Sequence, residues 1–192
     1  MKKGFLFILI FILFFNQLSI FSSDRSDSLD LMKKCEEESK ILEISVKNFG
    51  EDKDKNDFEN SLNLIKTGKI KVAQSKYLDA KKYFNDYLQF QYNTYKVLTE
   101  RYIKRTELLV DEVAVDLADF ITDGEILRNF EAANNYITMA KSFYGQKHYD
   151  KGINPCRMGK QKLLDNYKLV GKEVPEKYKI DLFDNAKKIF SK

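Results

Sequence analysis

Residues 77–120 read YLDAKKYFNDYLQFQYNTYKVLTERYIKRTELLVDEVAVDLADF and decide the fold. They lie between Gly68 and Gly124, in an interval that contains neither glycine nor proline. Apart from one double step across Arg105–Thr106, apolar side chains recur there at steps of three and four residues, the spacing that gathers side chains on one face of an α-helix. Because so long a helix is unusual in a globular protein, we expect a break near residues 93–94 or 104–106. The apolar positions are Tyr77, Ala80, Phe84, Leu88, Tyr92, Tyr95, Leu98, Tyr102, Leu109, Val113, Leu117 and Phe120.

The remaining sequence predicts further amphipathic helices. Glycine (8) and proline (2) are scarce in the 192 residues, which favours helices over hairpins and sheets. The fold class predicted is all-α, as an irregular helical bundle or a short helical array with one long central helix, and residues 24–192 are expected to form a single domain. Before the long stretch we predict a helix over 28–49, a charged loop over 50–56 and a helix from Asp57 to near Gly68. After it we predict a helix over 125–144, a helix that ends at about residue 170 and a last helix that begins at Pro175. Asn154-Pro155 either caps the start of the helix that ends near residue 170 or kinks its interior.

The charge balance argues against nucleic-acid binding. The formal net charge is +4, and Lys2 and Lys3 supply two of those charges at the N-terminus. Nucleic-acid binding requires a concentrated basic face, whereas the lysine pairs of this chain are interspersed with acidic residues. The strong bias toward lysine over arginine is typical of an AT-rich, spirochaete-like bacterial genome. It indicates nothing about the mechanism of the protein.

The N-terminus has the order of a secretory signal peptide over residues 1–23. A short basic start is followed by twelve residues without a polar side chain, Gly4 to Phe15, and then by small and polar residues up to Ser23. The apolar run is short for a membrane span. An uncleaved membrane anchor is the alternative, because apolar character extends to Phe21.

No catalytic motif can be recognised, and we expect neither enzymatic activity nor a cofactor or metal. His148 is the only histidine, so a histidine-rich metal site is excluded. Phosphate-cradling glycine loops, HExxH and G-x-S-x-G are all lacking from the sequence. The two cysteines, Cys35 and Cys156, either pair as a disulfide in an oxidising compartment or remain separate buried thiols.

Aromatic residues crowd the first part of the long stretch. Six lie within thirteen positions and cannot all face one side of a helix. Either this helix is packed on two sides, or some of the rings form a contact surface for a partner, since tyrosine combines a large contact area with a polar tip. The candidate partner-binding residues of this group are Tyr87, Phe90, Tyr92 and Tyr95.

Two segments resemble tetratricopeptide repeats, which are helix pairs of about 34 residues in which bulky and small residues alternate. Together they cover about a third of the chain, with repeat-like units at about 57–90 and 133–166. The positions that carry the resemblance in the second unit are Tyr136, Met139, Ala140 and Phe143 in its first helix and Tyr149, Gly152, Ile153, Cys156 and Gly159 in its second. In the first unit they are Leu64, Gly68, Tyr77, Ala80 and Phe84.

The resemblance implies that the first helix of the second unit lines a surface for a bound polypeptide. Its polar positions, Asn134, Asn135, Thr138, Lys141 and Ser142, are the tentative partner-binding residues. Asparagine offers donors and acceptors to the backbone of an extended peptide. The favoured function is an exported interaction module or scaffold, periplasmic or bound to the cell envelope, whose partner is another envelope protein or a peptide. A membrane would be contacted only through an uncleaved N-terminal segment.

Two other functions remain open. One is a surface adhesin or virulence-type factor, which export and composition alone support. The other is a carrier of a hydrophobic ligand, which an enclosed apolar cavity among the aromatic residues of the long helix would favour.

We expect cleavage of the N-terminal segment between about Ile20 and Asp24, because small polar residues follow the apolar run there. Intact-mass measurement of protein purified from the envelope fraction tests this. A chain that still begins at Met1 would identify an anchored protein instead.

Overall fold

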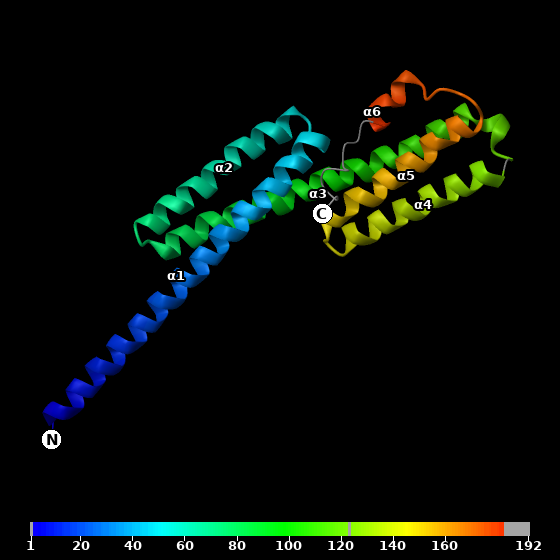
Figure 1. Ribbon diagram of the computed structural model, residues 1–192. Helices are drawn as coiled ribbons and strands as arrows, with labels where there is room; N and C mark the ends of the chain where they lie inside the picture. Colours follow the sequence, from blue (N-terminus) through cyan, green and yellow to red (C-terminus); the bar gives the residue numbers. More distant parts are fainter. Residues whose placement is uncertain (1, 123, 183–192) are drawn as a thin grey trace. The chain divides into compact units, whose positions relative to one another are not determined.

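The computed structural model describes residues 2–122 and 124–182, and for residues 2–22 and Leu182 the backbone alone. Every regular element in these ranges is helical, which confirms the predicted all-α class (Figure 1). The side chains of the expected signal segment and the end of the last predicted helix lie outside the described residues. The elements are α1 (Lys2–Phe49), α2 (Asp52–Ala73), α3 (Tyr77–Asp116), the 3₁₀ turn η1 (Ala118–Phe120), α4 (Gly124–Gly145), α5 (Tyr149–Leu169), η2 (Glu176–Tyr178) and α6 (Lys179–Leu182).

The long helix α3 runs unbroken through both positions where we expected a break, so that prediction was wrong. Two threonines of α3, Thr99 and Thr106, are buried, and their hydroxyls find hydrogen-bond acceptors while the helix continues. Thr106 Oγ1 donates to the carbonyl of Tyr102 at 2.7 Å, and Thr99 Oγ1 donates to the carbonyl of Tyr149 at 2.5 Å. Small polar side chains with satisfied hydroxyls can therefore continue a packed helix face.

The helices divide into two compact units, the first of which comprises residues 1–43 and 55–90. Its core joins α1, α2 and the first part of α3. Gly68 of α2 lies directly against the ring of Phe84 on α3, where a Cβ would overlap the ring. The buried members of this core are Cys35, Ile65, Ala80, Phe84 and Tyr87.

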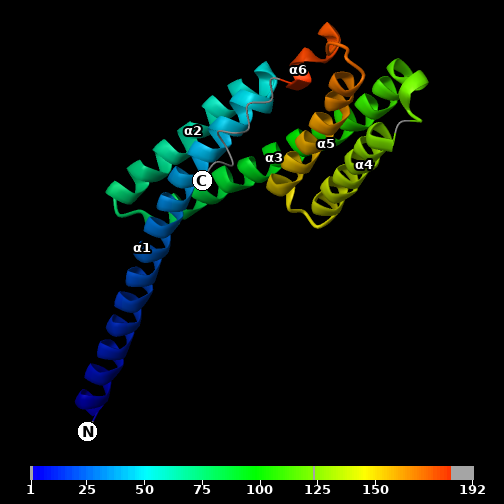
Figure 2. The ribbon, with the colours of Figure 1, turned by 45° about the vertical axis from the view of Figure 1, so that its right-hand side comes forward.

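The second unit comprises residues 44–54 and 91–192. In it α4 and α5 form a helical hairpin, and both lie along the later part of α3 in the two views of Figures 1 and 2. The largest cluster of buried side chains belongs to all three helices and to η2, and consists of Leu109, Val113, Leu117, Ile126, Phe130, Ala133, Leu163, Leu164, Tyr167 and Tyr178.

Two glycines let α5 approach its neighbours closely. A Cβ on Gly152 would overlap Thr99 Cγ2, and one on Gly159 would lie 3.3 Å from Thr106 Cγ2 and 3.4 Å from the carbonyl oxygen of Ala133. The same seven-residue interval separates the two glycines and the two threonines. Because seven residues make about two helical turns, the contact repeats on one face of each helix.

The connection between α1 and α2 is shorter than predicted. The charged loop expected over 50–56 is reduced to Gly50 and Glu51, and α2 begins at Asp52 rather than near Asp57. Asp54 explains the early start, because its Oδ2 accepts a hydrogen bond from the backbone N–H of Glu51 at 2.8 Å. This is one of the two hydrogen bonds of a capping box, in which the side chain of the third helical residue accepts from the backbone N–H of the residue before the helix.

The two prolines also take different places from those expected. Pro155 is buried inside α5, which already begins at Tyr149, so the prediction that Asn154-Pro155 caps this helix was wrong. Pro175 precedes η2, and α-helix proper starts only at Lys179.

We expect Gly152→Ala to destabilise the chain by about 1–3 kcal/mol, because the added methyl group forces α5 away from Thr99. Chemical denaturation monitored by circular dichroism measures this. Gly145→Ala is the matched control. No atom lies within 4 Å of the added carbon there, so it should be neutral or slightly stabilising. Equal stability of the two variants would contradict the close approach.

Candidate functional site

The outer face of α4 carries all five polar residues that the repeat resemblance singled out. Asn134, Asn135, Thr138, Lys141 and Ser142 are exposed. Two apolar side chains share the exposed side of this helix, since Leu127 is 45% and Met139 48% exposed. This set of seven residues is called the α4 face below.

The polar residues of the α4 face differ in how firmly they are held. Lys141 Nζ is 2.6 Å from the carboxylate of Glu107 on α3. Thr138 Oγ1 donates to the carbonyl of Asn134 at 2.9 Å, and Ser142 Oγ accepts from Gln146 at 3.1 Å. These contacts leave the amide groups of both asparagines at the surface.

The aromatic residues proposed as a contact surface are mostly internal. Tyr87 is fully buried in the core of the first unit, and Phe90, half-buried, packs beside it with ring centroids 6.5 Å apart. Tyr95 is buried in the second unit, where its hydroxyl lies 3.5 Å from Ser45 Oγ. Tyr92 is 39% exposed, but its ring packs edge-on against Tyr149. An aromatic partner surface is therefore the wrong interpretation for Tyr87 and Tyr95, because α3 is packed on more than one side.

A cavity of about 460 Å³ opens in the second unit. The end of α1, the turn after it, α3, α5 and α6 all contribute to its wall. Its aromatic wall is Phe49 against Tyr102, with ring centroids 5.1 Å apart in an edge-to-face arrangement. The lining residues are Asn48, Phe49, Gly50, Glu51, Arg101, Tyr102, Arg105, Lys160, Ile180 and Asp181.

Charged groups from three helices meet at this cavity. Asp181 of α6 accepts from Arg105 of α3 at 2.7 Å and 3.2 Å, and from Lys160 of α5 at 3.2 Å. The Lys160 and Asp181 side chains are 5% and 3% exposed. Lys160 Nζ also lies 4.4 Å from the centre of the Tyr102 ring, a cation–π contact that offsets part of the cost of burying the ammonium. We call Arg105, Lys160 and Asp181 the buried ion cluster.

Arg101, one turn before Arg105 on α3, holds the α1–α2 turn. Its guanidinium is 2.7 Å from Asp54 and 3.2 Å from Glu51. Successive arginines of α3 thus bind two separate chain segments at the rim of the same cavity.

Another carboxylate fixes the segment before α6. Asp116, at the end of α3, accepts from the hydroxyls of Tyr167 at 2.8 Å and Tyr178 at 2.9 Å, and pairs with Lys177 at 3.1 Å. Burial alone raises the pKa of Asp116, but these donors outweigh it and the pKa lies below its usual range.

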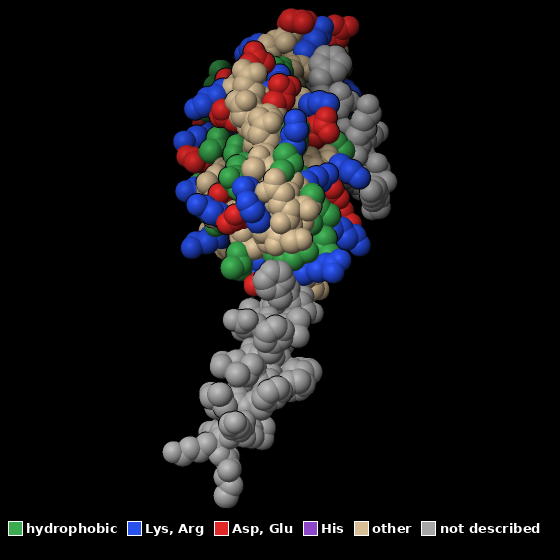
Figure 3. Space-filling model, turned by 90° about the vertical axis from the view of Figure 1, so that its left-hand side faces the viewer, with side chains coloured by type: hydrophobic (Ala, Val, Ile, Leu, Met, Phe, Trp, Pro, Cys, Tyr) green, Lys and Arg blue, Asp and Glu red, His purple; other side chains and the backbone are tan. Residues whose placement is uncertain are grey.

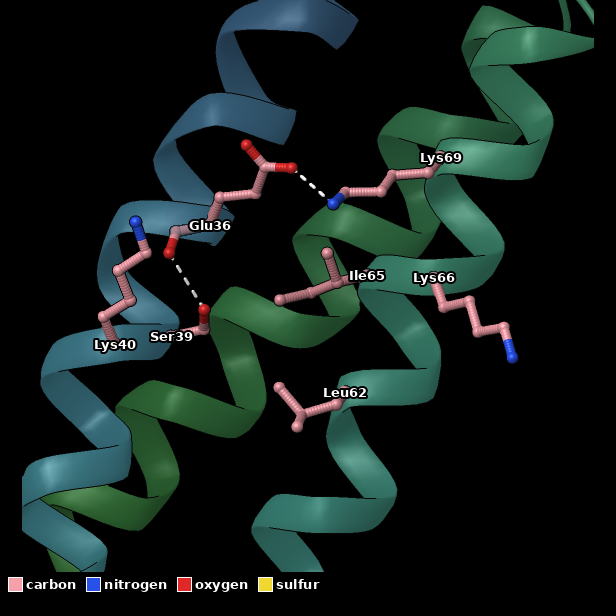
Figure 4. Close-up of a pocket in the computed structure, with 7 residues that line it drawn as sticks. All are labelled: Glu36, Ser39, Lys40, Leu62, Ile65, Lys66 and Lys69. Atoms are coloured by element: carbon pink, nitrogen blue, oxygen red, sulfur yellow. Dashed lines mark hydrogen bonds and ion pairs between the residues drawn. The ribbon is translucent and has the colours of Figure 1, made fainter.

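A shallow groove between α1 and α2 in the first unit is the other hollow of note (Figure 4). Leu62 and Ile65 point into it, and Glu36 and Lys69 form an ion pair across it. Lys40 and Lys66 point away in this view, so the groove does not present a concentrated positive charge. Figure 3 shows the same mixing over a wider face, where basic and acidic side chains alternate.

In the described ranges no cluster of three or more histidine, cysteine or acidic side chains could hold a metal ion. His148 is exposed, directly before α5. Both cysteines are free and buried, as in the alternative of separate thiols, and burial raises the pKa of Cys35 to about 11 and that of Cys156 to about 12. Within residues 23–122 and 124–182, moreover, no helix combines the length and apolar character of a membrane span.

The sequence analysis missed the buried ion cluster. Arg105 and Asp181 are 76 positions apart, and nothing in the local pattern distinguishes either from a surface charge. Comparisons with models of protein families, with curated proteins and with solved structures gave no match.

We expect both thiols to react slowly with thiol-specific reagents in the native chain at pH 8. The thiolate is the reactive form, and pKa values of about 11 and 12 leave well under about 1% of each thiol ionised. Labelling with a chromogenic disulfide reagent should therefore be slow in buffer and reach two thiols per chain in denaturant. Rapid native labelling would show that a core opens, and no thiol in denaturant would show that Cys35 and Cys156 pair.

Proposed function

We propose that this chain is an exported helical protein of the cell envelope that works by binding another polypeptide on the α4 face. The observation that carries the proposal is the composition of that face. Leu127 and Met139 are exposed beside Asn134, Asn135 and Thr138 on a helix whose opposite side is firmly packed. Exposed apolar groups among amides suit a surface that buries contact area and also bonds a peptide backbone.

The packing behind the α4 face supports this proposal. Ile126, Phe130, Ala133, Ile137 and Ala140 are buried on the inner side of α4, so the outer side is held in a fixed register. The α4–α5 hairpin coincides with the unit that resembles a tetratricopeptide repeat, and its small residues occupy the close contacts, as in that family. A preorganised face loses little conformational entropy on binding.

The proposed location follows from the sequence of residues 1–23, with the basic start and apolar run of an exported protein. A surface adhesin would use the same kind of contact with a different partner. A carrier of a wholly apolar ligand is less well supported, because charged side chains of Arg101, Arg105, Lys160 and Asp181 line the cavity beside Phe49 and Tyr102.

We expect Asn135→Ala with Thr138→Ala to reduce partner capture about tenfold, since two contact residues worth about 0.7 kcal/mol each give that factor. The measurement is quantitative pull-down of the tagged full chain from its own envelope fraction. Stability should hold within about 0.5 kcal/mol, because both positions are exposed.

Asn63→Ala with Asn85→Ala is the matched control, since both are exposed amides in the first unit. It should capture as much partner as the unchanged chain. Equal capture by both double variants would refute the role of the α4 face.

A further inference from the structure

The buried ion cluster has the composition of a site that recognises a carboxylate. Arg105 approaches Asp181 through two nitrogens, Nε and Nη2, at 3.2 Å and 2.7 Å, and Lys160 adds a third donor at 3.2 Å. A guanidinium that meets a carboxylate through two donors, with an ammonium beside it, is the geometry by which proteins bind acidic groups.

The two cations that bind the Asp181 carboxylate, Arg105 and Lys160, belong to the long helices α3 and α5 of the second unit. Arg105 also pairs with Glu112 on its own helix at 3.1 Å, and Lys160 lies over the Tyr102 ring. At the cavity wall Asn48 Nδ2 is buried and finds no hydrogen-bond partner among the described residues. The cavity wall therefore combines the cations of Arg105 and Lys160, the aromatic surface of Tyr102 and an amide donor of Asn48 that has no partner among the described residues.

The carboxylate side comes from α6 (Lys179–Leu182), which follows η2 directly. Tyr178, just before it, is fully buried and bonded to Asp116, which fixes the chain up to that point. Within α6 the side chain of Ile180 is 79% exposed although it borders the cavity, whereas Asp181 is buried. The acidic group is thus the part of this segment that the unit takes up.

We propose that the cavity of the second unit is a binding site for acidic peptide segments of a partner protein, and that Asp181 of α6 occupies it as an internal ligand. The segment it takes presents one aspartate or glutamate side chain to Arg105 and Lys160, as Asp181 does. The incoming carboxylate replaces that of Asp181 between Arg105 and Lys160, so the buried cations keep a counter-charge throughout. The site is separate from the α4 face, so its test is independent of that proposal.

The test uses two synthetic fluorescent peptides with the sequence of residues 176–182, EKYKIDL, and its asparagine counterpart EKYKINL. Each is titrated against the full chain and against the Asp181→Asn full chain by fluorescence anisotropy. Asp181→Asn keeps the shape of the side chain but removes the charge that competes with the peptide.

The Asp181→Asn chain should bind the aspartate peptide at least about tenfold more tightly than the asparagine peptide. The unchanged chain should bind the aspartate peptide at least about tenfold more weakly than the variant does, because a tethered ligand competes at an effective concentration in the millimolar range. Lys160→Met with Asp181→Asn removes one receptor cation together with the acid, and should lose most of the preference for the aspartate peptide.

Equal affinity of the Asp181→Asn chain for both peptides, or no binding while its circular dichroism is unchanged, would overturn the proposal. If that variant loses its helicity, the unchanged chain at millimolar peptide gives the same comparison. In that experiment the aspartate peptide must displace Asp181 from the cavity, and the asparagine peptide must not. Indistinguishable titrations of the two peptides against the unchanged chain would also overturn the proposal.

Discussion

The backbone of α5 runs close to its neighbours at two glycines. A methyl group at Gly152 would overlap Thr99 of α3, and one at Gly159 would crowd Thr106 of α3 and the carbonyl of Ala133 of α4. Interiors packed this densely transmit small displacements rather than absorb them. The positions of the α4 face on one side and of the cavity on the other both follow from this contact.

The link to the cavity is direct, because Lys160 is the residue after Gly159. With the α5 backbone held at this distance from α3, the Lys160 ammonium reaches both the Tyr102 ring and the Asp181 carboxylate. An ammonium this deeply buried is tolerated only with a counter-charge, and removing the partner of such a group commonly costs about 3–5 kcal/mol. The buried ion cluster therefore ties α6 to α3 and α5 by electrostatics.

The sequence was informative wherever one helix face decided the outcome. Helical periodicity predicted the all-α fold, and the repeat resemblance singled out Asn135, Thr138 and Ser142, which are exposed on α4. It could not tell that Tyr87 and Tyr95 are buried, because a helix packed on two sides has no single apolar stripe. The early start of α2 was missed because the capping carboxylate of Asp54 was taken for part of a charged loop. The ion cluster joins residues from distant parts of the chain, so no local pattern contains it.

The seven-residue interval between Gly152 and Gly159 also sets where this protein can change length. Deleting or inserting one residue between them would turn everything beyond it by roughly 100° about the axis of α5, and a bulkier neighbour would then face Thr106. A change of length within α5 would therefore break this contact. The connections on either side, residues 146–148 and 170–175, lie outside the helix, so a change of length there leaves the spacing of the two glycines unchanged. Evolutionary insertions and deletions, and engineered tags or reporters within the chain, should therefore accumulate in those two connections while α5 keeps its length.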